Sequence, residues 1–90
     1  MSYESQLQYL RRVNDLIRSL ASQLTPSEIV EVRHLVDHTE PAEGLRTLAW
    51  FIHDGNKQVS VETRRLIVEL TGGLVDREHL PESFREYDSS

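Results

Sequence analysis

The sequence predicts an all-α fold: a compact four-helix bundle with short connections and a frayed C-terminal tail. Four stretches carry apolar residues every three or four positions, and each is bounded by a capping or helix-breaking residue. Strand-like alternation is confined to "KQVSV", which is too short to form a sheet. Ninety residues leave room for one core, so we expect a single domain over 1–90. Its ordered core should span about 4–75, with the tail at 76–90 partly ordered.

The first helix is expected at about 4–23. Its apolar positions follow one helical face, and several are seven residues apart, as in a coiled-coil seam. They are Tyr3, Leu7, Leu10, Val13, Ile17, Leu20 and Leu24. We predict that this seam packs along the other three helices, which would make the protein a monomer. The alternative is a homodimer that uses the same seam.

The second and third helices are marked by their ends. "TPSE" at 25–28 predicts a helix start with a capping box between Thr25 and Glu28, and this helix should run to about Asp37. Pro41 interrupts the pattern and opens a third helix to about His53. "DGN" ends it, with Gly55 as the expected left-handed cap.

A fourth helix is expected at about 61–71, capped by Ser60 and stopped by "TGG". Beyond it, "DREHL" predicts one more turn before Pro81. "PESFREYDSS" is expected to fray.

Composition and charge restrict the possible partners. The chain has no cysteine, no apolar run near the roughly 20 residues of a membrane span and no signal-peptide pattern in "MSYESQLQYLRR", so we expect a cytoplasmic protein. The net charge is −5, and acids outnumber bases six to three at 25–58. Nucleic-acid binding needs a basic face. The sequence therefore favours a basic protein partner over a nucleic acid or a membrane.

Patterns typical of catalysis or metal binding are weak. His34 and His38, with Glu31 beside them, are four residues apart, but they fall nearly opposite the apolar stripe and lack the "HExxH" pattern. We interpret them as a solvated face or as part of a binding surface. No serine has a "GxSxG" context, and "TGG" lacks the "GK[ST]" ending of a phosphate loop. We expect no enzymatic activity, no cofactor and no metal.

Acidic side chains gather where the second helix meets the third. Asp37, Glu40 and Glu43 share this corner, with Asp54 and Glu31 as outer members of the group. Acids at a helix N-terminus stabilise the helix itself by roughly 0.3–1 kcal/mol each. The functional alternative is that this corner binds a basic partner.

Trp50 lies off the apolar stripe of its helix, which consists of Leu45, Leu48, Ala49 and Ile52. One interpretation is that a second element buries it, and the long first helix is the candidate for that cover. The other is that Trp50 is a partly exposed anchor for a protein partner, because Trp dominates interface hot spots. Phe51, at the border of the stripe, should behave as core in both cases.

The segment from Val32 to about Leu74 resembles small helical immunity proteins of bacterial polymorphic-toxin and contact-dependent inhibition systems, of the MafI-like type. The resemblance covers about half of the chain. The matching residues are Leu35 and Val36, Glu40, then Gly44, Leu45, Leu48 and Ile52, then Val59 and Ser60, and finally Ile67 and Leu70. Two positions depart from the family pattern, since Trp50 stands where an acid is usual and Pro41 where an aromatic is common.

The resemblance implies a four-helix inhibitor that neutralises a cognate toxin domain, often a nuclease, by occluding its active site. Acidic side chains can replace phosphates in a basic substrate cleft, which agrees with the charge of this chain. The alternative is a non-enzymatic regulatory or structural protein. The partner-binding candidates are Glu31, His34, Asp37, His38, Glu40, Glu43, Trp50 and Asp54.

Overall fold

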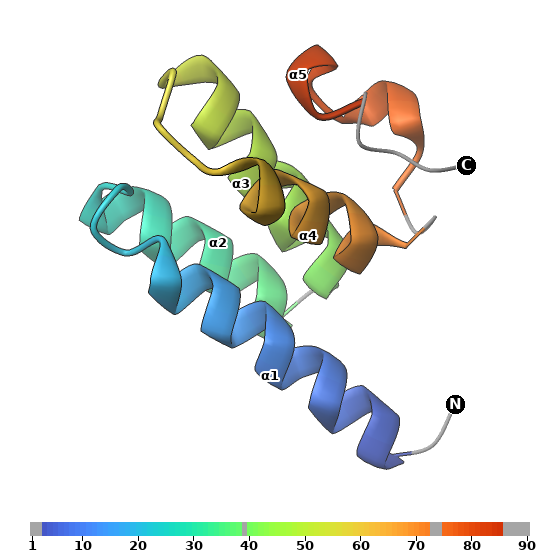
Figure 1. Cartoon of the computed structure of the whole chain (residues 1–90). Coiled ribbons are helices and arrows are strands. Elements are labelled where there is room, and N and C mark those ends of the chain that lie inside the picture. Colours follow the sequence, from blue (N-terminus) through green and yellow to red (C-terminus); the bar gives the residue numbers. More distant parts are fainter. Residues whose placement is uncertain (1–2, 39, 73–74, 86–90) are drawn as a thin grey trace.

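The computed structural model describes residues 3–38, 40–72 and 75–85. These ranges contain four long α-helices and two short helices near the C-terminal end, and no strand (Figure 1). The elements are α1 (Tyr3–Ser19), α2 (Pro26–His38), α3 (Pro41–Asp54), α4 (Val61–Thr71), the 3₁₀ helix η1 (Arg77–His79) and α5 (Glu82–Arg85). The predicted all-α bundle is confirmed. Within the same ranges, no helix has the length and apolar character needed to cross a bilayer.

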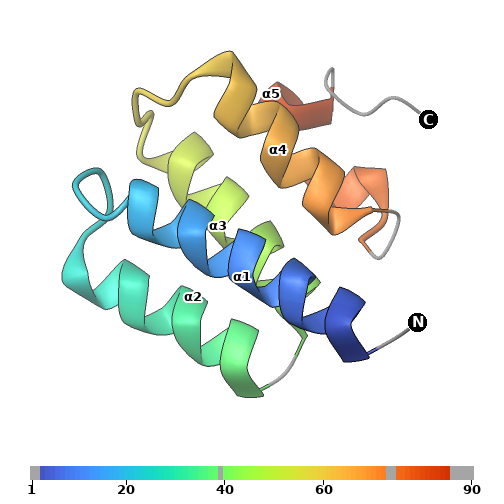
Figure 2. The same cartoon turned by 60° about the horizontal axis from the view of Figure 1, so that its bottom comes forward.

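Helix α1 lies over the other long helices, with α2 on one side and α4 on the other (Figures 1 and 2). Its seam faces inward, since Val13 and Ile17 are fully buried. The Tyr9 hydroxyl donates to the Leu70 carbonyl of α4 at 2.6 Å, and burial raises the pKa of Tyr9. On the other side, Arg33 of α2 donates to the side chain of Asn14 at 3.4 Å. The predicted seam is confirmed as internal at Val13, Ile17, Leu20 and Leu24, whereas Leu7 is exposed and Leu16, which the prediction left out, is buried.

Helix α1 ends four residues earlier than expected. Its last turn tightens, because the Leu20 N–H is shared between the carbonyls of Leu16 and Ile17, at 3.2 and 3.1 Å. The Ser19 hydroxyl also donates to the Leu16 carbonyl, at 2.7 Å. Side-chain and i−3 hydrogen bonds of this kind compete with a continued α-helix. The chain then turns, and Leu20 and Leu24 still contribute to the core.

Helices α2 and α3 form a closely packed pair. The predicted capping box starts α2, because the Thr25 N–H donates to the Glu28 carboxylate at 2.9 Å and the Glu28 N–H donates to the Thr25 hydroxyl at 3.2 Å. Gly44 lets the two helices approach. A Cβ at this position would stand 2.5 Å from Cγ2 of Val36 and 3.1 Å from the carbonyl oxygen of Val32.

The end of α3 differs from the sequence prediction. Gly55 has a right-handed conformation, with φ −84°, and the left-handed residue is Asn56, with φ 48°. The Lys57 N–H reaches back to the Ile52 carbonyl and the Asn56 N–H to the His53 carbonyl, at 3.0 and 3.1 Å. These two bonds make a Schellman motif one residue later than predicted, and Asn tolerates its left-handed position. The prediction that Gly55 is the left-handed cap was wrong.

Helix α4 has both predicted caps. The Ser60 hydroxyl accepts the Thr63 N–H at 3.2 Å, and Gly72 is left-handed with φ 50°. Within α4, Ile67 is fully buried and Leu70 nearly so, and both join the core.

The C-terminal segment 75–85 is an integral part of the core. It lies beside α3 and α4, on the side of α3 away from α2 (Figure 1). Phe84 is 0% exposed, and Leu80 and Pro81 are also buried. The predicted turn in "DREHL" is confirmed as η1, whereas Glu82–Arg85 form the short helix α5 instead of fraying. The rest of the tail, 86–90, lies outside the described residues.

Candidate protein-binding surface

The outward face of α2 carries Glu31, His34, Asp37 and His38, all of them exposed. As predicted, His34 and His38 lie opposite the buried Val32 and Val36. The rings of His34 and His38 lie 4.8 Å apart between centroids, tilted by 39°. These four side chains therefore make one polar face that offers two imidazoles and two carboxylates to a partner.

The corner between α2 and α3 keeps two carboxylates accessible. Glu40 is the N-cap of α3, and its backbone carbonyl accepts the N–H groups of Glu43 and Gly44 at 3.0 and 3.3 Å. Its side chain makes no capping bond and stays exposed, as does Asp37. Glu43 is half-buried and pairs with Arg46 at 3.1 Å. The structure thus supports Asp37 and Glu40 as accessible acids and ties Glu43 to its own helix.

Charge on α2 and α3 is unbalanced once internal pairs are considered. Lys57 binds Glu28 at 3.1 Å, Arg46 binds Glu43, and Arg33 donates to the side chain of Asn14. The remaining carboxylates of this region have no ion-pair partner among the residues that the structure describes; they are Glu31, Asp37, Glu40 and Asp54. The free charge of this surface is therefore negative.

Trp50 is half-buried, and the element that covers it is the C-terminal segment. The indole Nε1 donates to the His79 carbonyl at 2.7 Å, and the indole ring meets the His53 ring edge to face at 5.7 Å between centroids. The expectation that the first helix supplies this cover was wrong, because α1 packs on the opposite, apolar stripe of α3. Part of the indole remains accessible. Phe51 is half-buried against the core, near the role expected for it.

The C-terminal cover also brings together residues that the sequence pattern did not single out. His53 Nδ1 lies 3.0 Å from the Ser83 hydroxyl. Asp76, Glu78 and His79 are exposed, and their oxygen and nitrogen ligand atoms lie within 4.8 Å of one another. One feature of the sequence could have indicated this packing. Leu80 and Phe84 are apolar and four residues apart, which is typical of a short segment that packs against a core.

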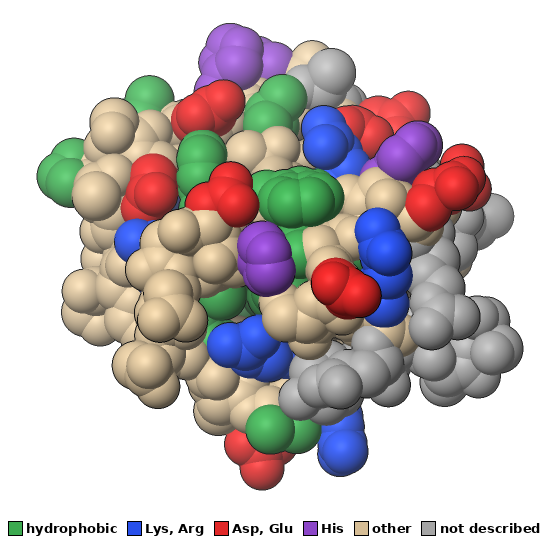
Figure 3. Space-filling view, turned by 90° about the horizontal axis from the view of Figure 1, so that it is seen from above, with side chains coloured by type: hydrophobic (Ala, Val, Ile, Leu, Met, Phe, Trp, Pro, Cys, Tyr) green, Lys and Arg blue, Asp and Glu red, His purple; other side chains and the backbone are tan. Residues whose placement is uncertain are grey.

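This side of the molecule is a mosaic of charge around a small apolar area. Figure 3 looks onto the side where α3 and α5 lie uppermost in Figure 1. Acidic, basic and histidine side chains surround a hydrophobic patch there. Protein interfaces likewise combine a polar rim with a more apolar centre.

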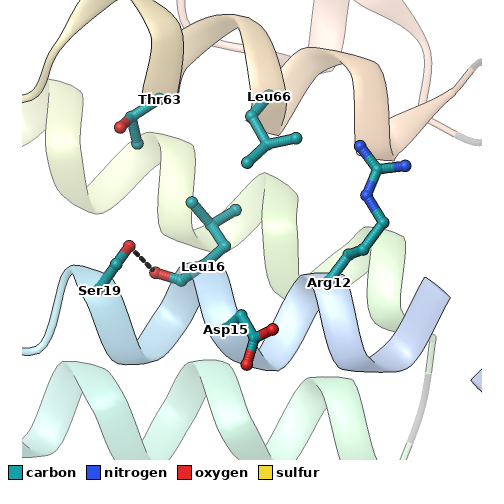
Figure 4. A pocket seen from close by; sticks show the side chains of 6 residues that line it. All are labelled: Arg12, Asp15, Leu16, Ser19, Thr63 and Leu66. Carbon is teal, nitrogen blue, oxygen red and sulfur yellow. Dashed lines mark hydrogen bonds between the residues drawn. The ribbon is translucent and has the colours of Figure 1, made fainter. Parts of the chain in front are cut away.

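A shallow groove of about 330 Å³ separates α1 from α4, and Figure 4 shows its lining. It is formed by Arg12, Asp15, Leu16, Ser19, Thr63 and Leu66. Its hydroxyls are used locally, because Ser19 donates to the Leu16 carbonyl and Thr63 accepts from Ser60. Asp15 pairs with Arg18 at 3.4 Å. The groove lining thus offers no nucleophile held by a base, which is the arrangement that covalent catalysis requires.

A scan against protein-family models and searches of curated proteins and of solved structures found no match to this chain. Its function has to be inferred from the surface itself.

Proposed function

We propose that this protein is an immunity protein that binds and neutralises a bacterial toxin domain. The observation that supports this is the set of unpaired carboxylates on α2 and α3, where Lys57 and Arg46 are held in internal ion pairs and Arg33 is the one base of the region outside them. A surface with free negative charge favours a positively charged protein partner.

A nuclease is the toxin class that this surface fits best. The active-site cleft of a nuclease must attract a phosphate backbone, so it carries lysine and arginine. Exposed carboxylates such as Asp37 and Glu40 can make charge-assisted hydrogen bonds to those same groups. Binding in this way would occlude the cleft without any catalysis by the inhibitor. We accordingly propose no enzymatic activity and no cofactor, and a cytoplasmic site of action.

The alternative function, a homodimer built on the first helix, has less support. Val13 and Ile17, at the centre of its seam, are fully buried within one chain. A second copy would find only the outer part of α1, where Leu7 is 37% exposed. We therefore propose that the protein acts as a monomer, which sedimentation equilibrium tests directly.

The decisive experiment is protection from a toxin. A large gene with a variable C-terminal domain directly upstream would supply the candidate toxin. Co-expression of that domain with this protein should restore growth, and the purified pair should form a 1:1 complex without nuclease activity. Growth arrest despite co-expression of the folded protein would refute the proposal.

Charge reversal tests the surface. The double change Asp37→Lys and Glu40→Lys should slow association with the toxin and flatten its salt dependence, because rim charges act mainly on association rate. Glu62→Lys is the matched control, since Glu62 is also exposed but lies at the start of α4. An equal effect per reversed charge would show that net charge, and not this corner, governs the encounter.

A further inference from the structure

The end of α3 carries a chemically reactive pair of residues. Asp54 and Gly55 form the one Asp–Gly pair of the sequence, and both are exposed. In such a pair the glycine amide nitrogen can attack the carbon of the Asp carboxyl group, because glycine has no side chain to hinder the approach. The amide proton and the carboxyl hydroxyl leave as water, and a five-membered succinimide forms. Water then opens the ring, and opening at the main-chain carbonyl gives isoaspartate, in which the chain runs through the side-chain carbon.

The fold requires glycine at position 55. A Cβ at this position would stand 3.0 Å from the Phe51 carbonyl oxygen and 3.1 Å from Cε of Lys57. Both distances are shorter than ordinary van der Waals contacts. The Lys57 side chain therefore runs across Gly55, and close packing selects the residue that makes the preceding aspartate reactive.

The folded chain holds the reacting groups apart. The Gly55 N–H, which carries the attacking nitrogen, donates to the Phe51 carbonyl at 3.0 Å. Asp54 is the last residue of α3, so its backbone is helical. Ring closure requires this hydrogen bond to break and the Asp54 backbone to rotate until the nitrogen faces the carboxyl carbon. The cap of α3, formed by residues 55–57, must therefore open before the reaction can occur.

Lys57 ties this cap to α2. Its N–H donates to the Ile52 carbonyl at 3.0 Å, and its ammonium group binds the Glu28 carboxylate at 3.1 Å. The two side chains of this ion pair are 16% and 20% exposed, so solvent and salt screen it less than a pair on the open surface. The backbone and the side chain of one residue thus hold the end of α3 closed.

We propose that Asp54 is a site of spontaneous conversion to isoaspartate, and that the Lys57–Glu28 ion pair slows this conversion by keeping the cap of α3 closed. The reaction needs no co-reactant other than water. The added chain atom lies between residues 54 and 55, and both Schellman hydrogen bonds span this link. An isomerised chain therefore loses the cap, and the negative charge of residue 54 moves to a new position.

Peptide mapping of the full chain, incubated at pH 7.5, follows the reaction. Trypsin releases the peptide TLAWFIHDGNK, residues 47–57, whose one aspartate is Asp54. Isoaspartate changes the chromatographic retention of this peptide but not its mass, whereas deamidation of Asn56 raises the mass. The isomer should form about tenfold or more slowly in the folded protein than in the chain unfolded in guanidinium chloride, because only the open state reacts.

Variants separate the ion pair from other effects. Glu28→Gln removes the partner of Lys57 and should speed isomerisation of the folded protein about two- to fivefold. Thr25→Ala is the matched control, because it breaks the other half of the same capping box and keeps the ion pair, so the rate should stay unchanged. Asp54→Glu should abolish the second peptide peak, since glutamate would have to close a six-membered ring.

Three results would overturn the proposal. Equal rates in the folded and unfolded chains would show that the cap gives no protection, and a lack of isomer in the unfolded chain would show that the site is unreactive. Equal acceleration by Glu28→Gln and Thr25→Ala would assign the rate to the start of α2 instead of the ion pair. The measurements use no toxin, so their outcome is independent of toxin neutralisation.

Discussion

The indole of Trp50 and the backbone carbonyl of His79, 29 residues apart in the sequence, are joined by a 2.7 Å hydrogen bond. This bond fastens the C-terminal segment to the outer side of α3. It explains why a tryptophan can lie off the apolar stripe of its helix without being fully in water. The Trp50 N–H needs a partner when half-buried, and η1 supplies one.

Trp50→Phe keeps an aromatic ring but removes this donor. We expect it to lower the free energy of unfolding by about 1 kcal/mol, the usual net contribution of one hydrogen bond. Urea unfolding followed by circular dichroism at 222 nm measures the change. A loss above about 3 kcal/mol would mean that the packing of the larger indole ring, and not the hydrogen bond, is the main contribution of Trp50 to stability.

Phe84 should be a major contributor to stability although it is close to the C-terminal end. Its side chain is 0% exposed, and the guanidinium of Arg64 lies 5.4 Å from its ring centroid. Phe84→Ala should cost about 3–5 kcal/mol. Val30→Ala, at a residue 68% exposed, serves as the control and should change stability by less than about 0.5 kcal/mol. Similar losses for the two changes would contradict the core position of Phe84.

Gly44→Ala should destabilise the protein even though alanine favours helices by about 1 kcal/mol over glycine. The added methyl group would collide with Val36 and approach the backbone of Val32. Overpacking of this kind typically costs about 1–3 kcal/mol. Adding Val36→Ala should recover part of the loss, and the coupling in a double-mutant cycle measures how much of it comes from this contact. A stabilised Gly44→Ala variant would show that α2 and α3 separate easily.

Glu28 should make stability depend on pH in the acid range. The backbone N–H of Thr25 lowers the pKa of Glu28 below its ordinary value of 4.5, the ion pair with Lys57 lowers it further, and burial acts in the opposite direction. A carboxyl with a lowered pKa stabilises the fold above its unfolded pKa and loses this contribution as the pH falls through the folded value. Glu28→Gln should therefore cost about 1 kcal/mol at pH 7 and progressively less below pH 4.5. Thermal unfolding of the original protein and of Glu28→Gln from pH 7 to pH 3 tests this prediction. A stability difference that stays constant over this range would contradict it.

His34 and His38 are expected to bind no metal of structural importance. Their rings lie close together on an exposed face, but they are two ligands where a structural zinc site uses four. Added zinc should leave the melting temperature unchanged. A rise that depends on zinc concentration and disappears in His34→Ala would reverse this expectation.

Local signals in the sequence predicted most of the fold. The capping box at Thr25 and Glu28, the cap at Ser60 and the left-handed stop at Gly72 depend on neighbouring residues, so their chemistry can be read from a short window. The prediction of a left-handed Gly55 was wrong because Gly and Asn both accept this conformation. The Schellman hydrogen bonds form with Asn56 in the left-handed position.

The candidate surface was predictable only in part. The exposure of His34 and His38, with Glu31 beside them, follows from helical periodicity and was predicted, and Asp37 and Glu40 were predicted to share the corner between two helices. The cover of Trp50 was not, because it depends on contacts between α3 and residues some 30 positions later. No periodicity indicates which of several segments will dock on a given helix face. The cluster of Asp76, Glu78 and His79 next to the indole arises from the same long-range contact.

The burial of Phe84 has a consequence for synthesis on the ribosome. Translation delivers the chain from the N-terminus, and the contacts of Phe84 with the core cannot form until that residue has left the exit tunnel. Until then, the apolar surface that it covers beside α3 and α4 stays open to chaperones and proteases. The core is therefore complete only once residue 84 has emerged, and a message truncated before residue 80 would yield a chain with an incomplete core.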